Sequence, residues 1–494
     1  MIIALLVTSG CGEVATTSSS CKLSCTADSE CPSGQTCGEL GLCAAAGDTC
    51  SCTAGEFIAC NADSALFCNA QANGIMTESC GVAGCNAGAG RCNACVVDTS
   101  SCSADHTTLD HCGSDGVVAQ SEACAAGCVT GTAGAADRCG YVKPAWLPDV
   151  CNDPATMPNV SLANTPLDTQ QDSSCTGGVL QVNGTTFCVI RAGTIVLGDL
   201  KVTGTRAIAF VADDALTVNG TLDISADGPT AGPGAGTLGA GTPTINASYQ
   251  GGGGAGFAQA GGAGGGNDTG TIAGMAGGPT TDRLTTSPFV GGATTSPARC
   301  DNGTFFCLNS IDFPGGGGGG GALLIACRGK VSVSATGTID AGGGGGTGGG
   351  DHYPAGGSIA QGGAPGGGSG GFVVFQGVRV EITGKLYANG GGGGAGCGTD
   401  NCRGLPGSDG LRSSGGAPGG DPAGNTCGGG IGGSVSSAPG TGERTFSTGA
   451  AGSGGGGGST GRFLTFTPSG VAPVLTPVEA SPGPEVSSTS LPVQ

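Results

Sequence analysis

The sequence predicts an all-β protein, in which small disulfide-rich N-terminal modules precede a parallel β-helix (a β-solenoid) with long glycine-rich loops. Three observations lead to this prediction. Of 28 cysteines, 22 lie between Cys11 and Cys188; glycine supplies 108 of 494 residues while aromatics are only 4%; and strand–turn–strand segments repeat along the C-terminal half. So few large apolar side chains cannot fill a broad core, but they can fill a solenoid, whose coils each bury a few against their neighbours.

The first 20 residues are predicted to form a signal and a tether. The apolar run Ile2–Val7 is followed by Thr8-Ser9-Gly10-Cys11, which resembles the signal of bacterial lipoproteins. The resemblance implies that Cys11 becomes a lipid-bearing N-terminus, with a lipid anchor rather than a transmembrane span. The alternative is a signal remnant with Cys11 in a disulfide, because only an even number of cysteines can pair completely.

Residues 21–151 are predicted to form a stalk of disulfide-linked repeats. Four cysteines are spaced six apart, and a longer pattern then occurs twice, over Phe67–Cys92 and His111–Cys139. Cysteines this dense are typical of exported proteins, whereas zinc sites show regular four-ligand clusters, which are absent here. We therefore expect disulfides and no metal. The disulfide candidates are Cys25, Cys31, Cys37, Cys43, Cys80, Cys85, Cys92, Cys124, Cys128 and Cys139.

A linker over 152–175 is expected to lead into the solenoid, predicted over 176–467. Three segments align there, starting at Ala207, Ala322 and Gly371. Each has an apolar run, an alternating strand, a turn glycine and a second short strand, so that each repeat is best stacked on the next. The turn glycines are Gly220, Gly337 and Gly384, and the matching apolar residues are Leu222, Ile339 and Leu386. The Pro/Ser/Thr-rich tail 468–494 is predicted to be disordered.

The glycine runs between the copies are long, reaching seven residues at Gly315–Gly321. Alone, such runs behave as flexible linkers. Their recurrence at the same place in each copy favours order, and packed left-handed polyglycine II helices are compatible with them, because glycine lets backbones approach closely.

The sequence offers little chemistry. The net charge of −19 disfavours nucleic-acid binding, and no Gly-Lys-Ser/Thr tripeptide marks a nucleotide site, so no cofactor is expected. No Ser/His/Asp set stands out among the three histidines, and no catalytic residue is predicted. Asp223 and Asp340 occupy equivalent repeat positions and are candidates for a ligand or metal site. Solvent-facing strand residues are the simpler interpretation of these two aspartates.

The layout resembles glycine-rich, cysteine-rich surface lipoproteins of myxobacteria-like deltaproteobacteria. The matching stretches are Gly337–Gly346, Gly366–Gly371 and Gly461-Arg462. The resemblance implies a bacterial outer-membrane or cell-surface location and supplies no activity; free secretion is the alternative. We expect a structural or adhesive protein without turnover, which binds polysaccharide or surface proteins. A β-helix carbohydrate lyase or hydrolase, and a protein-binding module formed by the cysteine repeats, are the alternative functions.

Overall fold

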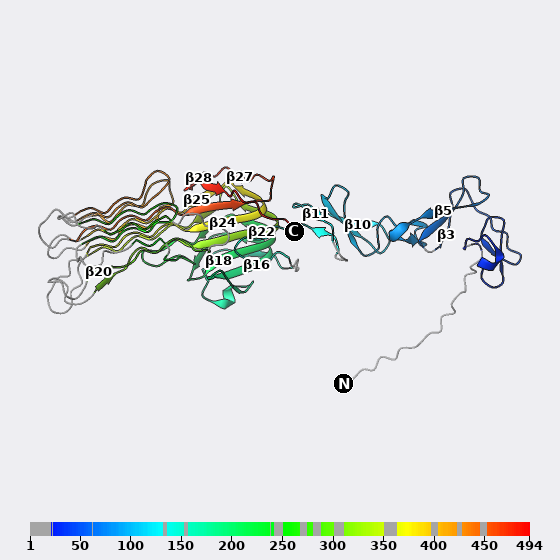
Figure 1. Ribbon diagram of the computed structural model, residues 1–494, viewed down its shortest axis with the longest axis horizontal. Coiled ribbons are helices and arrows are strands. Elements are labelled where there is room, and N and C mark those ends of the chain that lie inside the picture. The colour runs from blue at the N-terminus through cyan, green and yellow to red at the C-terminus, as the bar shows by residue number, and fades with distance from the viewer. Residues whose placement is uncertain are drawn as a thin grey trace, which may run out of the picture. The chain divides into compact units, whose positions relative to one another are not determined.

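The computed structural model shows an all-β protein with strands of widely different length (Figure 1). It describes residues 21–494 except 22, 62, 132–135, 153–156, 238, 242–249, 267–273, 280–287, 301–310, 350–362, 397–403, 422–426 and 445–451. The described residues form 29 strands and three short 3-10 helices, without an α-helix. The all-β prediction is thus confirmed. Two compact units divide the chain, Met1–Cys139 (unit 1) and Gly140–Gln494 (unit 2).

Unit 1 consists of small antiparallel sheets. Two of them have three strands each, in the orders β3-β4-β5 and β10-β9-β8. Its elements are η1 (Asp28–Glu30), β1 (Gln35–Cys37), β2 (Cys43–Ala45), β3 (Phe57–Asn61), β4 (Ser64–Cys68), β5 (Ile75–Ser79), η2 (Gly81–Ala83), β6 (Cys85–Asn86), β7 (Arg91–Cys92), β8 (Ser100–Cys102), β9 (Thr108–Cys112), β10 (Val118–Ala123), β11 (Cys128–Val129) and β12 (Arg138–Cys139).

The disulfides of unit 1 repeat with the sheets. The first three-stranded module is linked by Cys52–Cys68, Cys60–Cys85 and Cys80–Cys92. The second is linked in the same order by Cys95–Cys112, Cys102–Cys128 and Cys124–Cys139. All ten candidate cysteines are in disulfides, and the predicted disulfide-rich character is confirmed. Such short hairpins bury little apolar surface, so covalent links supply much of their stability.

Unit 2 is built on two large, mainly parallel sheets. The larger has the order β13-β16-β18-β22-β24-β26-β29; in addition, β15 pairs with β16, and β27 pairs with β24. The smaller has the order β14-β17-β19-β23-β25-β28. The strands are β13 (Val160–Leu162), β14 (Leu167–Asp168), β15 (Val179–Val182), β16 (Thr185–Leu197), β17 (Leu200–Thr203), β18 (Ala207–Val218), β19 (Thr221–Asp223), β22 (Gly321–Val333), β23 (Thr338–Asp340), β24 (Phe372–Ile382), β25 (Lys385–Tyr387), β26 (Arg462–Phe466), β27 (Val474–Leu475), β28 (Glu479–Ser481) and β29 (Pro484–Val486). The 3-10 helix η3 (Asp172–Ser174) precedes β15, and the hairpin β20 (Ala298–Cys300) and β21 (Ile311–Phe313) forms a sheet of its own.

The predicted repeats stack in register. Leu222 pairs with Ile339, and Ile339 with Leu386, in the smaller sheet. In the larger sheet β18, β22 and β24 pair along most of their length. One core of buried residues, including these three, joins the facing sides of both sheets. The large parallel sheets are as expected for a β-helix, although the described strands remain two separate sheets and do not close into a complete solenoid.

The other face of the larger sheet is covered by segments that the sequence analysis assigns elsewhere. Trp146 packs its ring edge-on against Phe289, Phe372 and Phe466, with centroids 5.7–5.9 Å apart. The amide of Gln376, which is fully buried, receives the N–H of Ala145 at 2.7 Å. Because both faces of the long strands are covered here, their first halves read as continuous apolar runs.

The predicted domain boundaries therefore change at both ends of the solenoid. The stalk ends at Cys139 instead of Cys151, and the segment predicted as a linker contributes β13 and β14 to the sheets. The predicted disordered tail contributes β27, β28 and β29, and it buries Leu491. Composition alone did not reveal these strands, because they are stabilised by pairing with strands far away in the sequence. The tether and Cys11 lie outside the described residues.

The glycine segments of unit 2 run side by side away from the sheets (Figure 1). Their hydrogen bonds have a period of three residues. Successive N–H groups of residues 390–396 donate in turn to 427–433, 365–368 and 405–408, at 2.8–3.0 Å, and the fourth N–H returns to the first neighbour. Three residues per turn without internal hydrogen bonds is the geometry of polyglycine II. We call these hydrogen-bonded segments the glycine array.

Close backbone approach explains why the array requires glycine. A methyl group at Gly391 would meet the carbonyl oxygen of Gly344 at less than 3.0 Å, and one at Gly393 would similarly meet that of Gly455. The obstacle is backbone, which cannot rotate away as a side chain can. Gly278, in contrast, is exposed and would place its methyl group in open space.

We expect Gly391→Ala to destabilise the protein by about 1–3 kcal/mol, because the new methyl group must push two hydrogen-bonded chains apart. Chemical denaturation measures this. Gly278→Ala is the matched control and should change the free energy of unfolding by less than about 0.5 kcal/mol. Equal effects of the two substitutions would contradict the close packing of the array.

The disulfide Cys151–Cys327 closes a loop of 176 residues and links the cover over the larger sheet to β22. Replacing both cysteines by alanine should cost about 2–5 kcal/mol in denaturation experiments. Cys175–Cys188 spans only 13 residues. Its removal should cost about 2 kcal/mol less, because a shorter loop restricts the unfolded chain less. A larger cost for the shorter loop would argue against this entropic account.

Candidate functional site

The two candidate aspartates lie in one row across the smaller sheet. Lys201, Asp223, Asp340, Tyr387 and Ser481 are registered partners on five consecutive parallel strands. The repeat alignment predicts the stacking of Asp223 on Asp340 and the replacement of aspartate by tyrosine in the third copy. Neighbouring parallel strands are about 4.8 Å apart, so this row concentrates polar and charged groups over a short distance.

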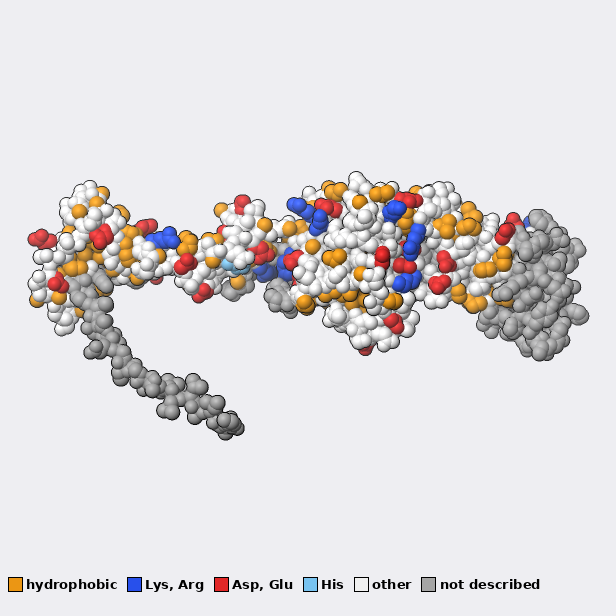
Figure 2. All heavy atoms as spheres, turned by 180° about the vertical axis from the view of Figure 1, so that it is seen from behind, with side chains coloured by type: hydrophobic (Ala, Val, Ile, Leu, Met, Phe, Trp, Pro, Cys, Tyr) orange, Lys and Arg blue, Asp and Glu red, His pale blue; other side chains and the backbone are white. Residues whose placement is uncertain are grey.

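Arg412, which the sequence analysis did not single out, joins both aspartates. Its Nε donates to Asp340 Oδ2 at 2.6 Å, and its Nη2 donates to Asp223 Oδ2 at 3.1 Å. The second oxygen of Asp223 accepts from Lys201 Nζ at 2.9 Å. Arg412 belongs to the array segment 404–421, and no sequence motif connects that segment with the strands beneath it. Elsewhere on unit 2 basic side chains also lie beside acidic ones (Figure 2).

Burial and hydrogen bonding drive the two carboxyl groups in opposite directions. Burial acts to raise the pKa of Asp223, but hydrogen bonds from Ser225 and Lys201 outweigh it and hold that pKa below its ordinary value. Burial raises the pKa of Asp340 above its ordinary value, and Arg412 offsets this only in part. Burial and the nearby Glu479 carboxylate also raise the pKa of Tyr387, whose hydroxyl donates to Glu479 at 2.6 Å.

This arrangement suits fixed charges better than proton transfer. Carboxyl groups with diverging pKa values can serve as an acid and a base. However, Asp340 is only 4% exposed, and Arg412 holds one oxygen of each carboxylate. The guanidinium also occupies the place between the carboxylates that a cation would take. A ligand or metal role for Asp223 and Asp340 stays a prediction.

An open groove of about 460 Å³ lies beside this ion-pair network. It crosses β17 and β19 on the outward face of the smaller sheet, next to the turn before β14. Its lining is polar and mixed in charge: Asn164, Thr165, Pro166, Asp199, Leu200, Lys201, Thr221, Asp223 and Arg412. None of these lining residues is aromatic. The groove is the place where the charged row meets solvent.

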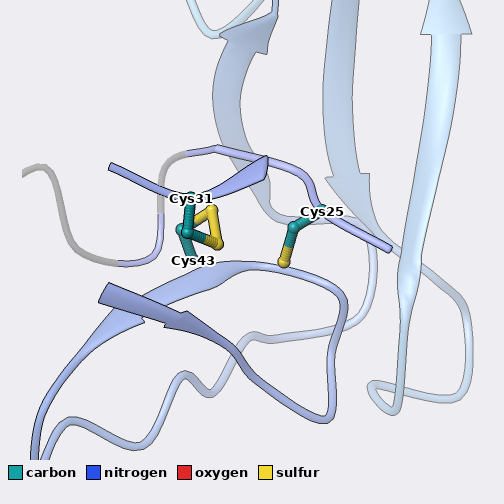
Figure 3. A group of neighbouring side chains, drawn as sticks. All are labelled: Cys25, Cys31 and Cys43. Atoms are coloured by element: carbon teal, nitrogen blue, oxygen red, sulfur yellow. A yellow bond between two sulfur atoms is a disulfide. The ribbon is translucent and has the colours of Figure 1, made fainter. Parts of the chain in front are cut away.

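The described cysteines of unit 1 that lie closest together are joined in disulfides. Among the described residues, one group of three potential metal ligands lies within 4.8 Å of one another: Cys25, Cys31 and Cys43. Figure 3 shows Cys31 and Cys43 joined to each other, and Cys25 is joined to Cys37. A metal binds the thiolate form of cysteine, which a disulfide does not offer. The group is therefore two adjacent disulfides.

Unit 1 also contains a Ser–His–Glu arrangement that the sequence analysis missed. Ser100 Oγ lies 2.8 Å from His111 Nδ1, and His111 Nε2 lies 3.7 Å from Glu122 Oε2. In the first module, the corresponding cross-strand pair is Phe57 and Phe67, with ring centroids 5.8 Å apart. The His111 and Glu122 side chains are 39% and 50% exposed. Both side chains are thus open to solvent, as cross-strand pairs on the surface of a hairpin commonly are.

Comparisons with known proteins add no relative: searches of protein-family models, of curated proteins and of solved structures each returned no match. In the described part of the chain, no helix has the length and apolar character of a membrane span.

We expect Arg412→Ala to lower the free energy of unfolding by about 1–3 kcal/mol, because it leaves the Asp340 carboxylate buried without its cation. A carboxyl group with a raised pKa destabilises the fold when ionised. The deficit should therefore shrink as the pH falls through that pKa toward the ordinary value of 3.8.

The matched control is Arg462→Ala, since Arg462 pairs with Glu485, which is 48% exposed. A pair with such an exposed partner contributes only about 0–1 kcal/mol. If Arg412→Ala kept the same deficit at every pH, uncompensated burial of Asp340 would not be its cause.

Proposed function

We propose that this chain is an exported cell-surface protein with a structural or adhesive role, which binds without catalytic turnover. The observation that carries the proposal is the disulfide framework of unit 1. Nine disulfides link the described cysteines between Cys21 and Cys139, and two modules share one connectivity. Disulfides at this density persist in oxidising compartments. Repeated modules with the same links are typical of spacers, since a catalytic site is usually built once.

The first residues of unit 2 support a role under tension. The N–H of Tyr141 donates to Gln494 O, and the N–H of Val142 donates to Cys327 O at 2.8 Å. Cys151 is joined to Cys327 as well. A pull on residue 140 is thus delivered to β22, a central strand, instead of peeling the sheet from its edge. Each disulfide in unit 1 also prevents its own loop from extending.

The proposal also includes the fold class of unit 2, the location of the protein and its partners. Unit 2 is proposed to be a member of the β-solenoid class, because the chain visits the two sheets in alternation. The resemblance to myxobacteria-like surface lipoproteins favours an outer-membrane location with Cys11 as the lipidated residue. A secreted protein is the alternative. Polysaccharide or surface proteins are the proposed partners.

One observation favours the alternative of a carbohydrate-active enzyme: the opposite pKa shifts of Asp223 and Asp340. Sugar cleavage needs two carboxyl groups that reach the scissile bond. Asp340 is buried and bound to Arg412, which weakens this alternative. For the protein-binding alternative, the first cysteine module offers exposed apolar side chains, with Val82 93% and Met76 53% exposed.

Export is tested on intact cells that produce the full chain. We expect a membrane-impermeant amine reagent to label the protein as completely on intact cells as after lysis. We further expect mass spectrometry to find a diacylated N-terminal Cys11. Labelling only after lysis would sink the proposal, whereas recovery of the unlipidated protein from the medium would replace the anchor by secretion.

Turnover is tested with the double variant Asp223→Asn/Asp340→Asn. The proposal expects no cleavage of polysaccharides by the natural chain, and surface display of the variant should equal that of the natural chain. Cleavage that disappears in the variant would establish the enzyme instead.

A further inference from the structure

The groove beside Arg412 has features that a solvent-filled gap between strands does not require. Its charged lining sums to zero: Asp199 and Asp223 are opposed by Lys201 and Arg412. An anionic ligand gains nothing from such a lining and is repelled by a chain with net charge −19. A cationic ligand gains little either, because Asp223 is already paired with Lys201 and Arg412, whose two charges offset those of Asp223 and Asp199. The groove therefore favours a ligand that is uncharged and polar.

The polar groups of the groove are fixed before any ligand arrives. Lys201 Nζ donates to Asp223 and to Ser225 O at 3.2 Å. Asp199 Oδ1 accepts the N–H of Thr221 at 2.8 Å. Arg412 is held by hydrogen bonds to Asp223 and Asp340. Side chains that are already ordered lose little entropy on binding, which is an advantage for a weakly attractive ligand.

Asn164 shapes one wall of the groove. Its backbone has φ +59°, a conformation that side-chain-bearing residues seldom adopt, and its N–H donates to Asp199 O at 2.6 Å. Asparagine tolerates this conformation better than most residues do, and its amide side chain lies at the lining. Together with the hydroxyls of Thr165 and Thr221, it supplies neutral groups that both donate and accept hydrogen bonds.

The geometry points to this groove as a binding site for a neutral saccharide. Sugar hydroxyls donate and accept hydrogen bonds at once, which matches a lining of carboxylates, cations, an amide and hydroxyls. Pro166, which is exposed, adds apolar surface for the C–H side of a sugar ring. The volume lies in the range of roughly 300–1,000 Å³ common for small-ligand sites. This assignment rests on the proposed binding function and names its ligand class.

The test measures binding of the purified full chain to cello-, chito-, xylo- and manno-oligosaccharides by calorimetry, with oligogalacturonate as an acidic comparison. At least one neutral series should bind. Asn164→Gly removes the amide while keeping a residue that tolerates φ +59°. It should weaken binding roughly 2- to 10-fold, the loss expected for one hydrogen bond. Thr221→Val should do the same.

Asn183→Gly is the matched control, because Asn183 also has a positive φ, of +48°, in an exposed turn and does not line the groove. Its affinity should equal that of the natural chain. No neutral oligosaccharide binding, binding of the acidic series alone, or equal losses in all three variants would overturn the assignment. Surface labelling of intact cells is independent of these outcomes, so failure of the groove leaves the proposed export and tether role in place.

Discussion

The hydrogen bond between glycine chains is the interaction on which unit 2 depends. The inner chain 390–396 donates to three neighbours in turn, so no single partner holds it. Carbonyl oxygens of neighbouring chains fill the space where Cβ atoms would be. This satisfies buried backbone groups without side chains, as buried peptides require. The cost is conformational entropy, which is largest for glycine and which apolar burial inside the array cannot offset.

The sheets offset this cost by setting the spacing of the array. Glycine chains leave the smaller sheet directly after β23 and β25, at Ala341 and Ala388, and glycine chains also lead into β22, β24 and β26 of the larger sheet. Both alanines belong to the apolar core. Parallel strands thus deliver neighbouring glycine chains already side by side and in register. The hydrophobic core is small, but its position lets it order a much larger volume of backbone.

The repeats could be predicted because their pattern is local in the sequence. Other features could not be predicted, because they depend on contacts between residues far apart in the chain. The alignment of Leu222, Ile339 and Leu386 follows from a strand period that is written in the sequence, and the position of Asp223 over Asp340 follows with it. Arg412 reaches these aspartates from 72 residues beyond Asp340 through a glycine segment whose path has no sequence signature. Trp146 and Leu491 were likewise assigned to the stalk and to the tail, because their partners are strands far away in the chain.

The ion pairs around Arg412 have a structural role in the array. Among the described residues, no strand adjoins segment 404–421 to fix its register, unlike the chains on either side of β22 and β24. Side chains fix it instead: Asp409 Oδ1 accepts the N–H groups of Gly228 and Gly345 at 3.0 and 2.8 Å, while Arg412 binds the aspartate row. Charged groups here replace the missing strand. The same contacts hold Arg412 fixed at the rim of the groove. The packing of the array and the shape of the groove are therefore coupled through one guanidinium group.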